Sequence, residues 1–152
     1  MIDIEVLKRG FDYDLWANQQ WLDCLIRTNA IEADMAIFVH ILGSAKTWAL
    51  RCHGISVPEP PKPDATQESL KEIHAMWMEI LEARNLDEFI PYKRYNGDPN
   101  EMQISWMAQH VINHSTYHRG ELRGLRRARN DQDFPDTDVA LYAFMVGGAK
   151  QS

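Results

Sequence analysis

The sequence has no long apolar run and no leader-like beginning. The apolar stretch over 36–39 already ends at His40, and no run approaches the ~20 residues that a membrane span requires. The first ten residues, MIDIEVLKRG, include Asp3 and lack the apolar core and cleavage site of a signal peptide. These absences predict a cytoplasmic protein with no membrane partner.

Basic residues and cysteines are also scarce. The 152 residues include 16 Lys and Arg against 22 Asp and Glu, a formal net charge of −6. An acidic chain lacks the positive field on which nucleic-acid binding relies, so we expect no nucleic-acid partner. The two cysteines, Cys24 and Cys52, are too few and too far apart for a disulfide framework or a CxxC site. We expect both to be small core residues.

Several catalytic motifs are absent as well. The sequence contains no glycine-rich phosphate loop and no nucleophile elbow. A zincin requires HExxH, but Ser115 follows His114. Ferritin-like diiron proteins require Glu-x-x-His pairs, and no histidine that could face a bundle core here has a glutamate three residues before it. Metalloprotease and carboxylate-bridged diiron chemistry are therefore unsupported.

Helical periodicity is the main pattern that is present. Apolar stripes predict four long helices, over about 4–28, 34–53, 64–85 and 105–130, and a short helix over about 139–146. Asp64 with Gln67 resembles a capping box, and Ser105 is the expected N-cap of the last long helix. Four prolines within 57–64 predict an extended connector, and 89–104 predicts an irregular or hairpin-like excursion. We therefore expect one all-α domain over 1–152, a four-helix bundle with a long proline-rich crossover and a short C-terminal helix.

Three of the six histidines, His110, His114 and His118, are spaced by four residues. On a helix they point to one side within about 80°, and the outer two lie ~12 Å apart along the axis. The outer pair cannot share an ion, because imidazole nitrogens must reach ~2.1 Å from a metal. A metal site would therefore use one adjacent pair and a third ligand from another helix.

The candidates for the third ligand are His40, His53 and His74. His40 is favoured, because it interrupts the strongly apolar segment AIFVHILGS, where an unpartnered imidazole is costly to bury. The alternative is that all of these histidines lie at the edge of the core and are satisfied by hydrogen bonds. If they bind metal, the site is mononuclear and keeps open positions for water or substrate.

Other features of the last long helix have simpler interpretations. Arg119, Arg123, Arg126 and Arg127 are typical of a solvated face, although Arg119 could face an anionic substrate group. Gly120 and Gly124 would let another helix approach closely. The tryptophans at 16, 48, 77 and 106 are expected to pack at core-facing or edge positions.

Segments along nearly the whole chain resemble the DinB family, also called DinB/YfiT-like metalloenzymes. They are YDLWANQQWL, FVHILGSAKTWALR, HVINHSTYHRGEL and DTDVALYAF. The resemblance implies a four-helix bundle, commonly a homodimer, with one divalent ion held by His40, His114 and His118. It places His110 beside the ligands rather than among them. Where the family pattern usually continues HRGQ, this chain has Glu121, which could orient a ligand or join the metal.

The resemblance implies a range of chemistry. Related branches are transferases or isomerases that use low-molecular-weight thiols, in which the ion makes a thiolate nucleophile. We therefore expect a mononuclear metalloenzyme of the thiol S-transfer type, with the open metal position as its reactive site. The ion would be zinc or nickel first, with iron, manganese, cobalt or copper also compatible with imidazole ligands. The alternative is a noncatalytic metal-stabilised dimeric scaffold or binding protein, with Glu121 closing the site. DNA binding, suggested only by the family name, does not fit an acidic chain.

Overall fold

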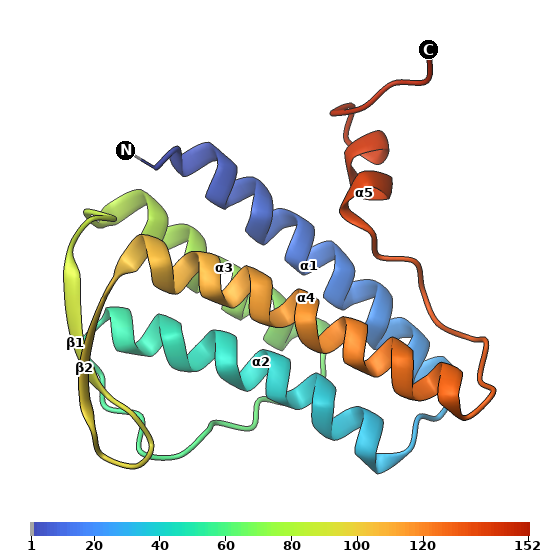
Figure 1. Cartoon of the computed structure of the whole chain (residues 1–152), viewed down its shortest axis with the longest axis horizontal. Coiled ribbons are helices and arrows are strands. Elements are labelled where there is room, and N and C mark those ends of the chain that lie inside the picture. The colour runs from blue at the N-terminus through green and yellow to red at the C-terminus, as the bar shows by residue number, and fades with distance from the viewer. Residues whose placement is uncertain (1) are drawn as a thin grey trace.

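Four long helices lie alongside one another in the computed structural model, which describes residues 2–152 (Figure 1). They are α1 (Ile4–Arg27), α2 (Glu32–Cys52), α3 (Gln67–Ala83) and α4 (Ile104–Ala128), followed by the short helix α5 (Val139–Met145). The strands β1 (Phe89–Lys93) and β2 (Pro99–Gln103) connect α3 to α4. The all-α prediction therefore fits broadly, with the addition of a small two-stranded sheet.

The two strands form an antiparallel hairpin, within the region predicted to be irregular or hairpin-like. The register pairs Phe89 with Gln103 and Lys93 with Pro99. Gly97 has φ 90°, in the left-handed region that glycine adopts without strain. Thr47 Oγ1 on α2 lies 3.1 Å from the hydroxyl oxygen of Tyr95 in the turn. The turn of the hairpin is thereby held against α2.

The proline-rich connector follows the predicted extended path and packs on α2. A Cβ at Gly43 would lie 2.3 Å from the carbonyl oxygen of Pro61. No other residue type fits there unless the backbone moves, so Gly43 allows the connector to approach the helix closely. Since Gly43 is one turn beyond His40, this contact fixes the connector beside the candidate metal ligands.

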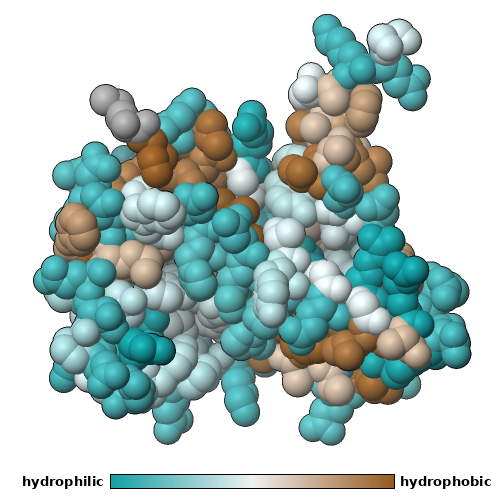
Figure 2. Space-filling model, in the orientation of Figure 1, coloured by the Kyte–Doolittle hydropathy of each residue, from teal (hydrophilic) through white to brown (hydrophobic). Residues whose placement is uncertain are grey.

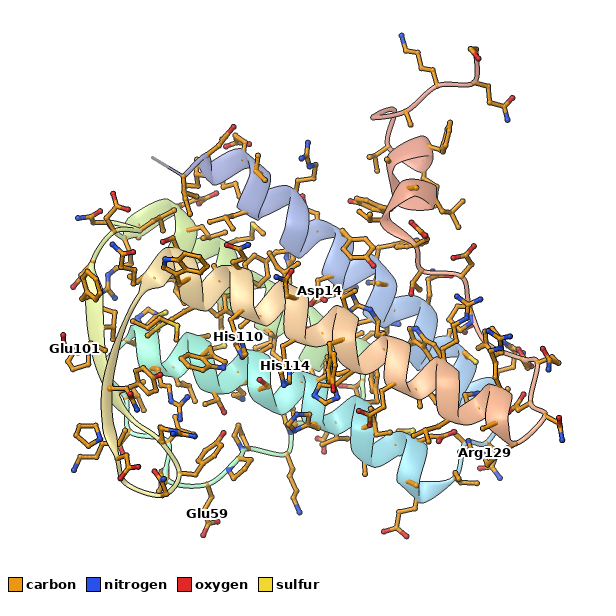
Figure 3. The ribbon with its side chains drawn as sticks, viewed as in Figure 1. Asp14, Glu59, Glu101, His110, His114 and Arg129 are labelled. Atoms are coloured by element: carbon orange, nitrogen blue, oxygen red, sulfur yellow. The ribbon has the colours of Figure 1, made fainter. Side chains whose placement is uncertain are left out.

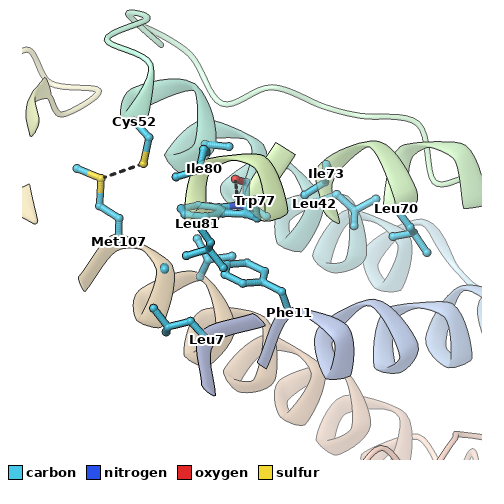
Figure 4. Packing of buried hydrophobic residues seen from close by; sticks show 14 of the residues in the cluster. Leu7, Phe11, Leu42, Cys52, Leu70, Ile73, Trp77, Ile80, Leu81 and Met107 are labelled. Atoms are coloured by element: carbon cyan, nitrogen blue, oxygen red, sulfur yellow. Dashed lines mark hydrogen bonds between the residues drawn. The ribbon is translucent and has the colours of Figure 1, made fainter. Parts of the chain in front are cut away.

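Aromatic and aliphatic side chains from all four long helices fill the core (Figure 4). The rings of Phe11 and Trp77 stack with centroids 4.9 Å apart. Trp77 Nε1 donates a hydrogen bond of 3.1 Å to the Ala45 carbonyl, so its one polar group is satisfied. Cys24 and Cys52 are buried and free, which confirms their assignment as core residues.

Two N-cap assignments differ from the sequence prediction. The N-cap of α3 is Thr66, whose Oγ1 accepts a hydrogen bond from the Ser69 N–H, and not Asp64. Helix α4 begins at Ile104, so Ser105 lies inside it and is buried. Trp106, expected at a core-facing or edge position, is 59% exposed. A cap depends on one side chain and not on the apolar stripe, so cap assignments from sequence alone miss by one or two residues.

The interpretations of the arginine stripe and of the α4 glycines are also wrong in part. Arg119 and Arg126 are buried rather than solvated. Each forms an ion pair with a buried aspartate of another helix, Arg119 with Asp14 and Arg126 with Asp34. A Cβ at Gly120 or Gly124 would meet nothing within 4 Å, so neither glycine serves a close helix contact.

Among residues 2–152, no helix combines the length and the apolar character that crossing a membrane requires.

Candidate metal centre

Helices α2 and α4 bring three of the predicted ligands together. His40 comes from α2, and His114 and His118 come from successive turns of α4. One ligand nitrogen of each imidazole lies within 4.8 Å of the others. His114 points from α4 into the space beside α2 (Figure 3). His40 therefore lies beside this pair in space, although α3 and the hairpin separate them in sequence.

The spacing of the nitrogens suits a metal ion. The Nε2 atoms of His40 and His114 are 3.3 Å apart. Two nitrogens at ~2.0–2.1 Å from a tetrahedral ion are separated by about 3.3–3.4 Å, so this edge of a coordination tetrahedron is already formed. The cluster includes no carboxylate among the described residues. A divalent ion held there would keep at least one position for another ligand.

Two of the three histidines are held in the neutral form, which can bind a cation. Burial lowers the pKa of His114 to about 4, and the neighbouring imidazoles His118, His40 and His110 add to the effect. Burial, followed by the proximity of His118, also lowers the pKa of His40. Both rings are therefore neutral near pH 7. A neutral imidazole has the free lone pair that a metal requires, and it does not repel the ion.

His118 has one ring nitrogen without a partner. Its Nδ1 is buried and forms no hydrogen bond, although Glu121 Oε2 lies only 3.3 Å away. A small rotation would let Nδ1–H donate to this carboxylate, which would leave Nε2 as the metal-binding atom. Glu121 is thus placed to orient a ligand, one of the two roles that the sequence suggested for it.

The remaining candidates divide into neighbours and distant residues. The His110 ring contacts that of His114, with centroids 5.2 Å apart, but is outside the ligand cluster. His74 Nε2 is 2.7 Å from Asp12 Oδ1, so this histidine is paired away from the ligand cluster. His53 is exposed at the end of α2. Arg119 hydrogen-bonds to Asp14 and Asn18 and does not line the cavity at the histidines.

A cavity of about 730 Å³ opens beside the histidines, between α2, the connector and the hairpin. His40, His110 and His114 line it, and Trp48, Tyr92 and Tyr95 supply aromatic walls. Its size falls in the range of ~300–1,000 Å³ that is typical of small-molecule sites. The centre therefore combines ligands for an ion with space for an organic molecule.

Sequence reasoning did not find Arg51, which also lines this cavity. Arg51 follows His40 by eleven residues, three helical turns, so helical spacing places the two on nearly the same face. The arginines of α4 form a cluster that is visible in the sequence, whereas Arg51 is isolated there.

Comparison with known proteins gives an informative likeness. The chain is similar to Protein DinB of Bacillus subtilis (strain 168). The two are 25% identical over 165 aligned positions, which cover 90% of this chain and 92% of the Bacillus protein. No family model matches the chain, and no solved structure matches it. The likeness supports a DinB-like protein over almost the whole chain, without specifying the chemistry.

Proposed function

We propose that this protein is a mononuclear metalloenzyme in which His40, His114 and His118 hold one divalent ion. The proposal is carried by the convergence of these three side chains beside a cavity large enough for a substrate. Imidazole ligands favour zinc or nickel, with iron, manganese, cobalt or copper as further candidates. The likeness to Protein DinB agrees with this assignment.

The reaction that we propose is thiol S-transfer, with a low-molecular-weight thiol or another small molecule as substrate. The bound ion would supply a Lewis acid that lowers the pKa of a thiol and favours its thiolate form. His40 and His114 stay neutral near pH 7 and do not themselves protonate the nucleophile. Glu121, 3.3 Å from His118 Nδ1, would orient this ring, and the aromatic walls of the cavity would contact the organic part of the substrate.

The alternative is a noncatalytic metal-stabilised scaffold or binding protein in which Glu121 is the fourth ligand. The observation that favours this alternative is the 3.3 Å distance between Glu121 Oε2 and His118 Nδ1. The ligand cluster of the described residues, however, contains only histidines. The open site is therefore better supported.

Thiol binding to the cobalt-loaded protein tests the proposal. We expect a thiolate-to-cobalt absorption band when 2-mercaptoethanol is added, and thiol conjugation to an electrophilic aryl halide that requires the metal. His114→Ala should abolish the metal content, the band and the conjugation together. Glu121→Gln should keep the band. A closed scaffold would give metal without a thiolate band in the wild type and a band only after Glu121→Gln.

Several finer expectations from the sequence stay predictions. They are the single bundle domain, the homodimer and the cytoplasmic location. The first is supported by four helices that share one apolar cluster. The homodimer is supported by exposed apolar side chains along α5 and the start of α1, and it is tested below.

A further inference from the structure

Three arginines of this protein are almost fully buried, and one of them differs from the others. Arg119 and Arg126 are 3% and 2% exposed, and their guanidinium groups pair with Asp14 at 2.6 Å and with Asp34 at 3.1 Å. Arg51 is 6% exposed, yet within residues 2–152 it forms no ion pair with any carboxylate. Burying a charge without a counter-charge costs free energy. The groups around Arg51 therefore indicate which kind of ligand would pair with it.

The protein satisfies Arg51 only in part. Its guanidinium carbon lies 4.6 Å from the ring centroid of Trp48 and 4.7 Å from that of Tyr92. Nη2 donates one hydrogen bond of 3.1 Å to the Lys93 carbonyl, and Nε is buried without an acceptor. An arginine has five N–H donors in a planar fork that matches a carboxylate or phosphate. Aromatic faces orient the fork here without neutralising it.

The guanidinium borders the same cavity as the candidate metal ligands. Arg51, His40 and His114 all line this cavity. Lys62 and Arg94 add positive charge to the wall, and Glu32 is the one acidic residue that lines it. The cavity is therefore positively charged although the whole chain is acidic. Long-range attraction from the net charge cannot explain binding of an anion, but a local site can.

His40 and Arg51 are far apart along α2. They are eleven residues apart, which corresponds to a rise of about 16 Å along the helix. Two aromatic rings connect these groups: the Trp48 ring contacts Arg51, the His110 ring contacts His114, and the centroids of the two rings are 5.1 Å apart. A molecule that contacts both His40 and Arg51 must be elongated, and its middle must pack against aromatic rings.

We propose that the cavity binds an elongated organic anion, with a terminal carboxylate or phosphate at Arg51 and its other end at the three histidines. The proposal deepens the proposed function, because it rests on the histidines holding an ion with an open position. The anion pairs with the unpartnered donors of Arg51, and Trp48 and Tyr92 enclose the body of the molecule. Small neutral thiols such as 2-mercaptoethanol fill only the histidine end.

The Arg51 end can be tested without any metal. We would titrate metal-free protein with 4-phenylbutyrate and with the neutral 4-phenylbutyramide by calorimetry. We expect the acid to bind at least about tenfold more tightly, a preference that Arg51→Gln removes and Arg51→Lys retains in part. Arg127→Gln, which removes an exposed arginine from α4, is the matched charge control and should keep the preference. Circular dichroism and urea unfolding establish that each variant is folded.

Equal affinity for acid and amide, no binding of the acid at millimolar concentration, or a preference that survives Arg51→Gln in a folded protein would each overturn the anion site. A second titration then tests the span. Zinc-loaded protein is given alkyl hydroxamates with a terminal carboxylate or a terminal amide, in short and long chains. The carboxylate should improve affinity only in the long chains and only with Arg51 present.

The two titrations separate this proposal from the proposed function. Failure to take up metal would refute the metal centre, while the phenylbutyrate preference would still report on Arg51. Metal uptake with tight hydroxamate binding, but without any effect of the terminal carboxylate, would leave the metal centre standing and overturn the elongated anion.

Discussion

At the residue scale, burial determines both the protonation of the candidate metal-binding histidines and the need of the buried arginines for a counter-charge. The pKa of His114 is lowered to about 4, chiefly by burial, whereas an unfolded histidine titrates near 6.5. Between these values the unfolded chain binds a proton that the folded chain does not. The metal-free protein should therefore lose stability as the pH falls from about 6.5 towards 4.

Urea unfolding of the metal-free protein at pH 7 and pH 5 measures this effect. The wild type should lose more free energy of unfolding between the two values than His114→Gln, because the variant lacks the shifted group. His53→Gln, altered at an exposed histidine, is the control and should behave as the wild type does. An identical loss in the wild type and in His114→Gln would contradict the electrostatic account.

The ion pair between Arg119 and Asp14 gives a second prediction at this scale. Removing one partner leaves the other charge buried and unpaired, so Arg119→Gln should lower the free energy of unfolding by about 3–5 kcal/mol. Arg127→Gln, on the exposed face of the same helix, should change it by less than about 0.5 kcal/mol. Similar values for the two variants in urea unfolding would show that Arg119 is solvated after all.

Cysteine reactivity follows from the same burial. The pKa of Cys52 is raised to about 12 and that of Cys24 is also raised, in both cases chiefly by burial. Because the thiolate is the reactive form, neither should react with a disulfide reagent at pH 8 until the protein is unfolded. Rapid reaction of the folded protein would contradict the packing that Figure 4 shows around Cys52.

The partners of buried charges were beyond sequence reasoning. The histidine spacing on α4 could be read directly, because it is local. The pairing of Arg119 with Asp14 joins residues that are 105 positions apart, and a run of arginines by itself is typical of a solvated face. Arg51 was missed for the related reason that its unpartnered state depends on which residues surround it.

At the scale of the elements, Gly43 and Gly124 make a matched pair of helical glycines. Gly43→Ala would place a methyl group 2.3 Å from the Pro61 carbonyl oxygen, so the connector must move and the protein should be destabilised by about 1–3 kcal/mol. Gly124→Ala meets nothing within 4 Å and should stabilise the protein by about 0.5–1 kcal/mol. Urea unfolding of both variants checks the opposite signs, and a stabilising Gly43→Ala would show that the connector does not pack on α2.

Periodicity predicted the helices well and their starts less well. The first helix, predicted over about 4–28, spans Ile4–Arg27, and the short last helix, predicted over about 139–146, spans Val139–Met145. Apolar stripes extend over several turns and are therefore robust, whereas a cap depends on one side chain. Thr66 and Asp64 are both good capping residues, and only the path of the incoming connector decides between them.

At the scale of the whole molecule, one apolar region is not covered. Figure 2 shows apolar surface on the beginning of α1 and on α5, with a hollow between them. A groove of about 710 Å³ lies there and is lined by Val6, Tyr13, Ile112, Val139 and Val146, among others. Val6 and Val139 are 49% and 57% exposed. A second copy of the chain would cover this surface in the predicted homodimer.

Sedimentation measures the oligomeric state directly. The wild type should sediment as a dimer, and Val139→Lys should shift it towards the monomer by placing a charge in the apolar groove. Ile26→Lys, at an equally exposed apolar residue near the end of α1, should leave the dimer unchanged. A monomeric wild type at tens of micromolar protein would refute the homodimer.

The metal content of the purified protein tests the central claim most directly. The wild type would be purified without an affinity tag or chelator beside a variant carrying His40→Ala, His114→Ala and His118→Ala, and beside His53→Ala as the control. We predict about one divalent ion per chain in the wild type and in His53→Ala, and none in the triple variant. A wild type that holds no ion even after zinc, nickel and manganese are added would contradict the account and leave these histidines with a structural role.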